Sequence, residues 1–451
     1  MKKNEIDMCS GSLFGKMLKF TIPIILTVVL QQLFNTADLV VVGKFGRSGA
    51  LAAVGATGAA VSLLINFFNG FSLGAGICMA RHYGAKNNDC ASDCVHTSVA
   101  LSVVAGTLLA VIAIIATPAL LSLMGTPDDV INDAVLYMRI YFAGMPFIML
   151  FNFCASILRA VGDSRRTLIY ISSAGVINVI LNIIFVTALD LNVAGVAAAT
   201  VISQAYAAIM CIRCFLKYDG CLKLDVKMLK IDLGQLKSIA AIGIPSGIQG
   251  TLFSISNVLI QSSINSFGTA VMSGTTAAGN IDGYIYLVMN SVSSTTANFT
   301  GQNFGAKNFP RIKRVILLSC LMTSFLGVVL GITANVFGAE LIGIYTSVPA
   351  EIAAGLTRLK YVGLPYFLCG IMEVFSGSFR GMNHSFSSMI ISLMGACVFR
   401  IIWIYTVFER FRTIDVLFLS YPVTWLITAL VLAVLLTIII RREELKLQPR
   451  Y

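Results

Sequence analysis

Three acidic side chains lie inside long apolar stretches of this chain, where a charge is expensive. They are Asp38, Asp282 and Glu373. An ionisable group within a membrane-spanning segment costs about 2.5 kcal/mol or more. Each acid is therefore a candidate functional residue, able to bind a cation, carry a proton or attract a positively charged molecule.

The stretch around Asp38 carries a polar stripe. Gln31, Asn35 and Asp38 are spaced at i, i+4 and i+7, which places them on one face of a helix. A polar face on an otherwise apolar helix is expected to point into a helical bundle or a wet cavity. The alternative is a hydrogen bond between helices that serves packing only.

Two further segments can supply partners to Asp38. Asn178 and Asn182 share a helix face, and Thr200 belongs to the next apolar stretch. At 1.5 Å per helical residue, Asp38, Asn178 and Asn182 lie about 28, 16 and 22 Å above the inner ends of their helices, and Thr200 lies about 12 Å below the outer surface. All four can therefore meet in the outer half. Such an oxygen-rich set suits Na⁺ or a protonatable Asp, and no other metal site is expected.

Asp282 and Glu373 are each expected about 20 Å from the outer surface, near the middle of a membrane. They have no evident basic partner, so we group them with Gln31, Asn35 and Asn257 as candidate substrate-binding residues. The structural alternative is an ion pair with Arg400. Arg159 and Arg380 end predicted helices, and both are expected to extend toward the cytoplasmic interface.

The composition excludes an ordinary soluble protein. Only 12% of the 451 residues are charged, 57% are hydrophobic and the mean hydropathy is +0.86, whereas soluble domains carry about 25% charged residues. Five uncharged stretches exceed the ~20 residues that a helix needs to cross hydrocarbon, namely 95–127, 167–189, 191–212, 315–339 and 416–440. They lack the alternation of barrel strands. We predict an all-α integral membrane protein, whose net charge of +11 reflects cytoplasmic loops and not nucleic-acid binding.

Apolar runs broken at Gly, Pro, Asn and charged clusters predict twelve transmembrane helices. Their expected ranges are 17–42, 50–80, 94–117, 134–158, 167–188, 192–216, 237–263, 270–299, 312–337, 358–379, 386–408 and 415–440. With both termini inside the cell, 24 of the 32 Lys and Arg residues fall on the inner side, including Lys2, Lys3 and Arg450. Because basic residues collect in cytoplasmic loops, we predict a multi-pass protein of the inner cell membrane with cytoplasmic termini.

The chain also repeats itself. Landmarks recur in unbroken order at shifts of 219 to 222 residues: Ile22-Pro23 with Ile244-Pro245, Asn35 with Asn257, Phe45-Gly46 with Phe267-Gly268, Gly84-Ala85-Lys86 with Gly305-Ala306-Lys307, Pro146 with Pro365, and Leu158-Arg159 with Phe379-Arg380. Asp38 has no acidic counterpart, because Ile260 takes its place. Two halves of six helices have the same orientation, related by a pseudo-two-fold axis along the membrane normal. We predict six-helix bundles over 1–216 and 237–451, joined by a cytoplasmic linker over 217–236.

At this level of detail the chain resembles the multidrug and toxic compound extrusion (MATE) family from Pro23 to about Ile440. The resemblance rests on Pro23, Gln31, Asn35, Asp38 and Gly43 at their spacing, the two Gly-Ala-Lys turns, the run Leu158–Asp163, and the pair Asn178 and Asn182. It implies two V-shaped bundles that export amphipathic, often cationic compounds by alternating access, driven by Na⁺ or H⁺ entry. It also implies that Asp38, Asn178 and Thr200 belong to the cation site.

The chain departs from the family pattern at two places. Family members often carry Asp where this chain has Asn182, and the acids in some relatives' seventh span have no match in residues 249–254. The loss of one of two negative charges should weaken Na⁺ binding. It would favour H⁺ coupling through Asp38 or dependence on the second-half acids.

Other functions fit the sequence less well. A flippase for lipid-linked precursors shares the architecture, but it would need a basic cavity, whereas the mid-membrane charges found here are mainly acidic. An enzyme would need a nucleophile or metal set, and the three histidines, His82, His96 and His384, are scattered. We therefore expect a transporter, a monomer surrounded by lipid, with small amphipathic or cationic substrates and no cofactor besides the coupling ion.

Overall fold

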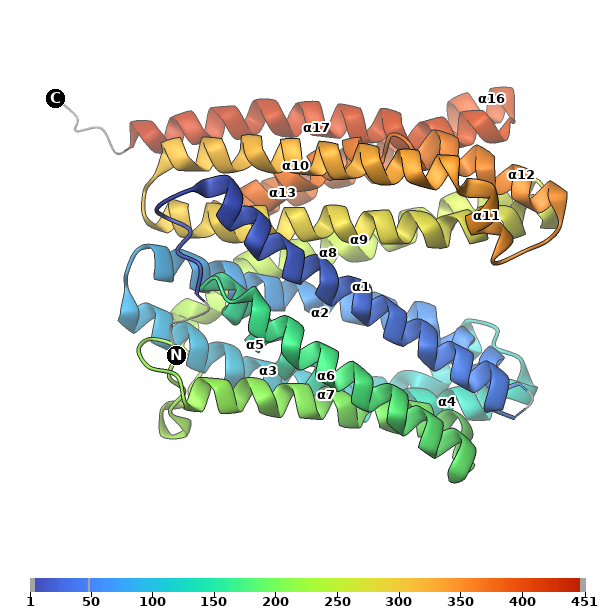
Figure 1. The fold of residues 1–451 in the computed structure, drawn as a ribbon, viewed down its shortest axis with the longest axis horizontal. Coiled ribbons are helices and arrows are strands. Elements are labelled where there is room, and N and C mark those ends of the chain that lie inside the picture. The colour runs from blue at the N-terminus through green and yellow to red at the C-terminus, as the bar shows by residue number, and fades with distance from the viewer. Residues whose placement is uncertain (1–4, 48, 447–451) are drawn as a thin grey trace. The chain divides into compact units, whose positions relative to one another are not determined.

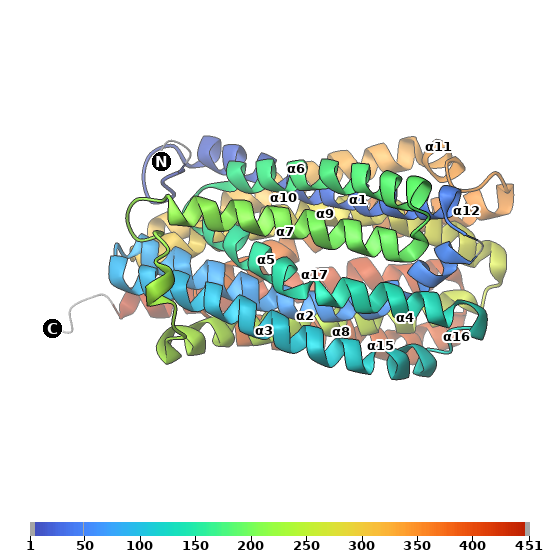
Figure 2. The same ribbon diagram turned by 90° about the horizontal axis from the view of Figure 1, so that it is seen from below.

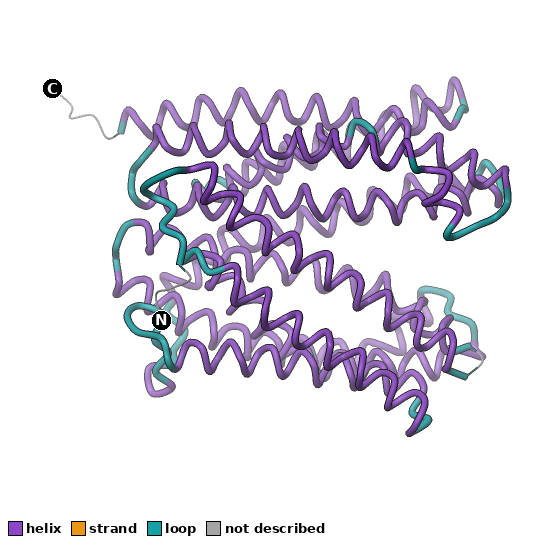
Figure 3. Tube along the Cα trace, viewed as in Figure 1, coloured by secondary structure: helices purple, strands orange, loops and turns teal. Residues whose placement is uncertain are grey.

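The computed structural model describes residues 5–47 and 49–446, which form helices joined by loops with no strand among them (Figures 1 and 3). Eight helices of this described part are long and apolar enough to span a membrane, or ten if each of two bent pairs is one span. Each of the twelve predicted ranges lies on a helix or a bent pair. The predicted all-α membrane fold is confirmed. Lys2, Lys3 and Arg450, which were used to predict the orientation, lie outside the described residues.

The chain forms two compact units, which we call unit 1 and unit 2. Unit 1 contains the residues up to Asp7 and Leu18–Gly247, and unit 2 contains Met8–Met17 and the residues from Ile248 onward. The long helix α8 therefore begins in unit 1 and ends in unit 2. The expected bundle boundaries at 216 and 237 stay a prediction.

Unit 1 is built mainly from the first seven helices. They are α1 (Leu13–Phe45), α2 (Ala50–Gly84), α3 (Asn88–Leu123), α4 (Asp128–Ala143), α5 (Met145–Ala160), α6 (Ser164–Ile183) and α7 (Asn192–Leu216). A π-helical turn, η2 (Ile184–Ala188), extends α6, and a short 3₁₀ turn, η3 (Val226–Met228), lies in the linker. Helices α6 and α7 run side by side, as Figure 2 shows.

Unit 2 is built from the remaining helices. They are α8 (Leu233–Asn265), α9 (Thr269–Gly305), α10 (Phe309–Val336), α11 (Gly338–Gly343), α12 (Pro349–Arg358), α13 (Tyr366–Gly381), α14 (Ser385–Ser392), α15 (Phe399–Trp403), α16 (Glu409–Phe411) and α17 (Ile414–Leu445). Three π-helical segments extend helices of this unit: η4 (Leu359–Gly363) joins α12 to α13, η5 (Leu393–Val398) joins α14 to α15, and η6 (Ile404–Phe408) joins α15 to α16.

Each unit packs its helices in the same way. In unit 1, α5 contacts α2, α3 and α7, and α6 contacts α7. In unit 2, α13 contacts α9, α10 and α17 (Figure 1), and the segment from α14 to α15 contacts α17. These are the neighbours that the sequence repeat predicts for equivalent helices. The duplication of the sequence is therefore also a duplication of the fold.

Two predicted spans, 134–158 and 358–379, are bent and not straight. The chain turns by 47° between α4 and α5 and by 42° between η4 and α13. Pro146 and Pro365 lie at these breaks, and proline has no N–H to donate to the carbonyl four residues earlier. The bends are thus equivalent features of the two halves. The sequence repeat pairs these two prolines, but it does not by itself predict that the helices bend there.

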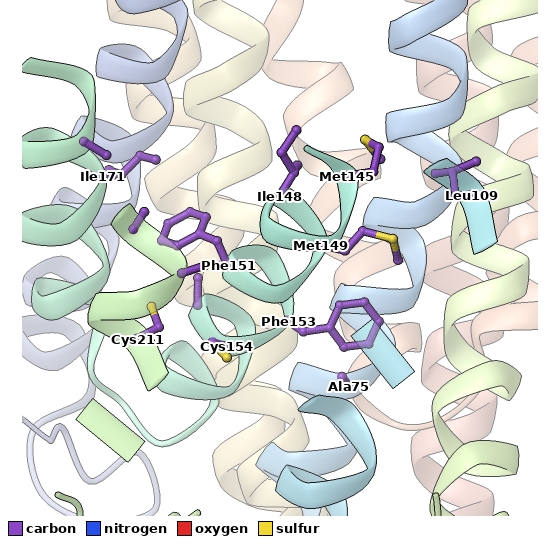
Figure 4. Packing of buried hydrophobic residues seen from close by; sticks show 14 of the residues in the cluster. Ala75, Leu109, Met145, Ile148, Met149, Phe151, Phe153, Cys154, Ile171 and Cys211 are labelled. Atoms are coloured by element: carbon purple, nitrogen blue, oxygen red, sulfur yellow. The ribbon is translucent and has the colours of Figure 1, made fainter. Parts of the chain in front are cut away.

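One apolar core joins the helices of unit 1. Ala75 of α2, Leu109 of α3, Phe153 of α5, Ile171 of α6 and Cys211 of α7 are all buried in one apolar cluster (Figure 4). Met145 and Met149 of α5 belong to the same buried cluster. This packing holds α6 and α7 in a fixed relation to the rest of unit 1.

Glycines allow the first half of α8 to approach α2 closely. A Cβ added at Gly70 would lie 2.4 Å from the Gly247 backbone nitrogen, and one at Gly74 would lie 2.4 Å from the Ile239 oxygen. No real side chain tolerates such distances. Small residues at a helix crossing let two backbones pack closely in a membrane protein, so this crossing fixes α8 on unit 1.

We predict that Gly74→Ala destabilises the protein, because its methyl group would push α8 away from α2. The cost should be about 1–3 kcal/mol, as for other overpacked sites, and it should appear as a lower melting temperature of the purified protein. Gly58→Ala on the same helix is the matched control, because nothing lies within 4 Å of a Cβ there. An equal melting temperature for both variants would show that the crossing is not tight.

Candidate functional site

The Asp38 carboxylate lies against α6 and α7 inside unit 1. Asn182 Nδ2 donates a hydrogen bond to Asp38 Oδ1, and Thr200 Oγ1 donates to Asp38 Oδ2 at 3.4 Å. An ionised carboxylate only accepts hydrogen bonds, so an amide N–H and a hydroxyl suit it. The four residues that the sequence grouped by depth include all of these partners.

The remaining contacts close a ring of hydrogen bonds. Asn178 Nδ2 donates to Thr200 Oγ1 at 3.4 Å, and Asn182 Nδ2 also donates to Asn178 Oδ1 at 3.3 Å. The structure therefore brings Asp38, Asn178, Asn182 and Thr200 together, with Asn178 and Asn182 buried and the other two half-buried. We call these four residues the Asp38 ring.

One polar atom of the ring is left over. Asn182 Oδ1 is buried and has no hydrogen-bond partner among the described residues. A buried polar atom without a partner costs about 1–3 kcal/mol. It is also a free oxygen ligand next to a carboxylate. Together with the Asp38 and Thr200 oxygens, it supplies the donor type that Na⁺ prefers.

Close packing holds α1 against α6 at the level of the ring. The ring of Phe34 lies so close to Gly175 that an added Cβ would be 1.7 Å from it. Only glycine fits at this position of α6. The contact is one turn from Asp38 on α1 and less than one turn from Asn178 on α6, so it sets the distance between them.

A second anchor holds the end of α1, and the sequence analysis did not find it. Asn192 Oδ1 accepts from the Arg47 backbone N–H at 3.1 Å, and Asn192 Nδ2 donates to Asp133 Oδ2 at 3.4 Å. Asn192 has a φ of +50°, a conformation that Asn adopts more readily than most residues. In the sequence, this role is indicated by the position of Asn192 at the start of a predicted helix, two residues after Asp190. At the surface, Arg47 also pairs with Asp190 at 2.6 Å, and this hydrogen bond raises the pKa of the Arg47 guanidinium.

The other polar residues of α1 and α8 do not join the ring. Asn35 and Asn257 are exposed, and Gln31 is half-buried. Gln31 and Asn35 share with Asp38 the helix face that their spacing predicts. Their assignment to substrate binding stays a prediction.

The expectation that Asp282 and Glu373 lack basic partners is wrong. Arg358 Nε donates to Asp282 Oδ2 at 2.9 Å, and Arg380 Nη2 lies 3.4 Å from Glu373 Oε2. Isolated charges are too costly in an apolar interior, so each acid is paired. The alternative prediction, an ion pair of these acids with Arg400, is also wrong. The Arg400 guanidinium instead donates from Nη2 to Thr424 Oγ1 at 3.1 Å.

Arg380 does not extend toward the interface as predicted. Its side chain is 12% exposed and turns inward to Glu373, two helical turns earlier on α13. Ser293 of α9 completes this contact, accepting from Arg380 Nη2 at 3.0 Å and donating to the Glu373 backbone oxygen at 2.7 Å. The spacing of seven residues between Glu373 and Arg380 was the signal that the sequence analysis missed.

No conventional metal centre accompanies these sites. Within residues 5–47 and 49–446, no group of three His, Cys, Asp or Glu side chains is placed to hold a metal ion. The Asp38 ring differs from such a centre because three of its four members are neutral.

Comparison with known proteins gives a consistent result. A family model described as MatE matches residues 23–184 and again residues 245–406. The two matches have equal length and lie 222 residues apart, which is the shift of the internal repeat. They cover well over half of the chain.

Curated relatives match along most of the chain. A Bacillus subtilis protein described as "Probable multidrug resistance protein YoeA" is 28% identical over 85% of this chain and 84% of its own. The multidrug export protein MepA of Staphylococcus aureus is 22% identical over 87% of both chains.

Among solved structures, an outward-facing multidrug resistance MATE family transporter covers 97% of this chain and 98% of its own, with a TM-score of 0.90 and 21% identity. A MOP superfamily transporter from Pyrococcus furiosus matches with the same TM-score, identity and coverage. At this identity the likeness concerns the fold. Because the family model matches both halves of the chain, at the shift of its repeat, this protein belongs to the MatE family of multidrug and toxic compound extrusion transporters.

Proposed function

We propose that the protein is a secondary active exporter in the inner cell membrane. It moves amphipathic, cationic organic compounds out of the cell by alternating access, in exchange for Na⁺ or H⁺. The Asp38 ring carries this proposal, because it places a single carboxylate and free oxygen ligands in an apolar bundle. The names of the relatives, a multidrug export protein among them, support the direction and the kind of substrate.

The coupling ion acts at Asp38. In the ring as it stands, Asn182 and Thr200 direct N–H and O–H groups at the carboxylate, which suits the ionised acid. A bound Na⁺ would need oxygens there instead. Rotation of the Asn182 amide by half a turn would present Oδ1, the atom that now lacks a partner among the described residues. A proton on Asp38 would also donate to that oxygen.

Neutralising Asp38 changes how α1 packs. An ionised carboxylate in an apolar bundle must keep its hydrogen-bond donors, so it holds α1 to α6 and α7. A proton or Na⁺ removes the net charge and relaxes that requirement. Substrate and ion then need only prefer opposite facing states for exchange to occur. Pro23, which lies within α1, is the place where this helix can bend at least cost.

The ion gradient supplies the free energy. A membrane potential provides about 2.3 kcal/mol per charge per 100 mV, and each tenfold concentration difference adds about 1.4 kcal/mol. When a singly charged cation leaves for each ion that enters, the two charges cancel and only the concentration difference of the ion drives export. The membrane potential contributes when the exchange carries net positive charge inward.

The pairing of the second-half acids changes their proposed role. A cationic substrate approaching Asp282 or Glu373 would compete with Arg358 or Arg380. The acids attract substrate only where an arginine moves away. We therefore place initial recognition at Gln31, Asn35 and Asn257 and give the two acids a secondary part. The same pairing neutralises Arg358 and Arg380, which leaves less of the basic character that a flippase for lipid-linked precursors requires.

We predict that Asp38→Asn abolishes ion-driven efflux. The amide has the same shape but carries no charge and takes no proton, so efflux in proteoliposomes under an imposed Na⁺ or H⁺ gradient should fall at least tenfold. Protein abundance and melting temperature should stay the same. Asp190→Asn is the matched control, because it makes the same chemical change in an exposed surface pair. Normal efflux by Asp38→Asn would remove this residue from the mechanism.

We also predict that Asn182→Asp strengthens the response to Na⁺. A second carboxylate beside Asp38 adds negative charge at the ring, so the apparent Na⁺ affinity should rise about tenfold, equivalent to about 1.4 kcal/mol. The measurement is the melting temperature as a function of NaCl, with choline chloride as the ionic-strength control. Asn182→Leu should show no response to Na⁺. Identical Na⁺ curves for wild type and Asn182→Asp would mean that this position is not a ligand.

A further inference from the structure

Unit 2 contains a buried arginine that the proposed mechanism does not use. Arg400 on α15 is 4% exposed. Among the described residues no carboxylate pairs with it, and its Nε has no hydrogen-bond partner. Its guanidinium lies over the ring of Tyr421, with Cζ 4.2 Å from the ring centroid. Because arginine stays protonated in proteins, unit 2 holds a permanent positive charge in an apolar segment.

The other titratable groups around this guanidinium do not balance its charge. Besides Tyr421 they are Tyr366, Cys369 and Cys397, whose side-chain types are neutral at physiological pH. Arg358 faces the same Tyr421 ring at 6.0 Å, and its own charge is matched by Asp282. The positive charge of Arg400 is therefore stabilised by an aromatic face and a hydroxyl.

The repeat places Arg400 at the position of Asn178. The two matched stretches of the family model begin at Pro23 and Pro245, and at this shift of 222 residues residue 178 corresponds to residue 400. The contacts agree with this alignment. Asn178 donates to Thr200 Oγ1 on α7 at 3.4 Å, and Arg400 donates to Thr424 Oγ1 on α17 at 3.1 Å. Both donors precede a π-helical turn, η2 and η6 respectively.

Two other members of the Asp38 ring, Asp38 and Asn182, have apolar counterparts in unit 2. Ile260, which is 1% exposed, corresponds to Asp38, and Ile404 corresponds to Asn182. A groove of about 510 Å³ runs between α8 and the segment from α15 to α16, with Leu259, Ile401 and Ile404 in its wall. The acid of its lining, Glu409, is paired with Arg412. At the equivalent position, unit 2 therefore has a cation where unit 1 has a carboxylate and its partners.

We propose that Arg400 is a built-in cation, which takes in unit 2 the position equivalent to the Asp38 ring and thereby confines ion exchange to unit 1. A mobile cation that approaches this position meets a fixed charge of the same sign and no carboxylate. The inference rests on the proposed role of Asp38 as the exchange site. According to this inference, residues 260 and 400 determine why unit 2 does not exchange ions and unit 1 does.

The test rebuilds an exchange site in unit 2 with and without Arg400. All variants carry Asp38→Asn, which removes the proposed ion-exchange site of unit 1. Ile260→Asp is then combined with either wild-type Arg400 or Arg400→Asn. The readout is local, because the two tryptophans of the chain, Trp403 and Trp425, both belong to unit 2, and the Trp425 ring lies 5.6 Å from the Tyr421 ring.

With Arg400→Asn, the added acid should make tryptophan emission and melting temperature respond to NaCl (against choline chloride) or to pH between 5 and 8. With Arg400 retained, the guanidinium neutralises the acid, and the response should be at least tenfold weaker. Equal responses in both backgrounds would overturn the inference, and so would no response from a folded Arg400→Asn variant. Val258→Asp, at a position that is 68% exposed on the same helix, is the matched control and should give equal responses in both backgrounds.

A second comparison does not require the removal of Arg400. If Arg400→Asn or the bulkier Arg400→Gln fails to fold, Ile260→Asp in the Asp38→Asn background remains decisive. Its melting temperature should not vary with Na⁺ or with pH between 5 and 8, whereas a clear dependence would contradict the inference. Failure of the proposed function is a separate result, because it appears as normal ion-driven efflux in Asp38→Asn alone.

Discussion

The structure depends on how one carboxylate is accommodated in an apolar helix. Asp38 would be too costly in this position without hydrogen-bond donors, and α6 and α7 supply them through Asn182 and Thr200. These bonds require α1 to lie close to α6, which the Phe34–Gly175 contact and the Asn192 anchor allow. The same requirement makes the site responsive, because a bound proton or Na⁺ removes the charge that demands the donors.

The two halves solve the burial of charge in different ways. Unit 1 surrounds a single acid with neutral partners, so its charge can be altered by a small cation. Unit 2 pairs Asp282 with Arg358 and Glu373 with Arg380, and it places Arg400 on an aromatic ring. Charges matched within the protein are poorly suited to exchange. The duplicated fold is therefore chemically asymmetric, which supports the proposal that the ion is exchanged in unit 1.

Much of the fold and of the Asp38 ring could be predicted from the sequence. The helical spacing of polar residues and their depth in the membrane both depend only on the residues of one helix. Asn178 and Asn182 share a helix face, and counting residues placed them in the same outer half as Asp38. The partners of Asp282 and Glu373 could not be found in this way. Arg358 is 76 residues from Asp282, and the two meet because α12 packs against α9. Arg380 ends a predicted helix and was therefore expected to extend toward the interface, although its spacing of seven residues from Glu373 also permits an ion pair between them. The Asn192 anchor depends on a loop conformation that the pattern of polar residues does not reveal.

The most direct test of this account is whether substrate binding displaces an ion from Asp38. Purified protein is saturated with a cationic substrate in weakly buffered solution, and the release of H⁺ or of radiolabelled Na⁺ is measured for wild type and for Asp38→Asn. The account predicts release from the wild type and none from the variant, because substrate and ion stabilise opposite states. Equal release from both proteins would contradict the claim that Asp38 is the exchangeable site.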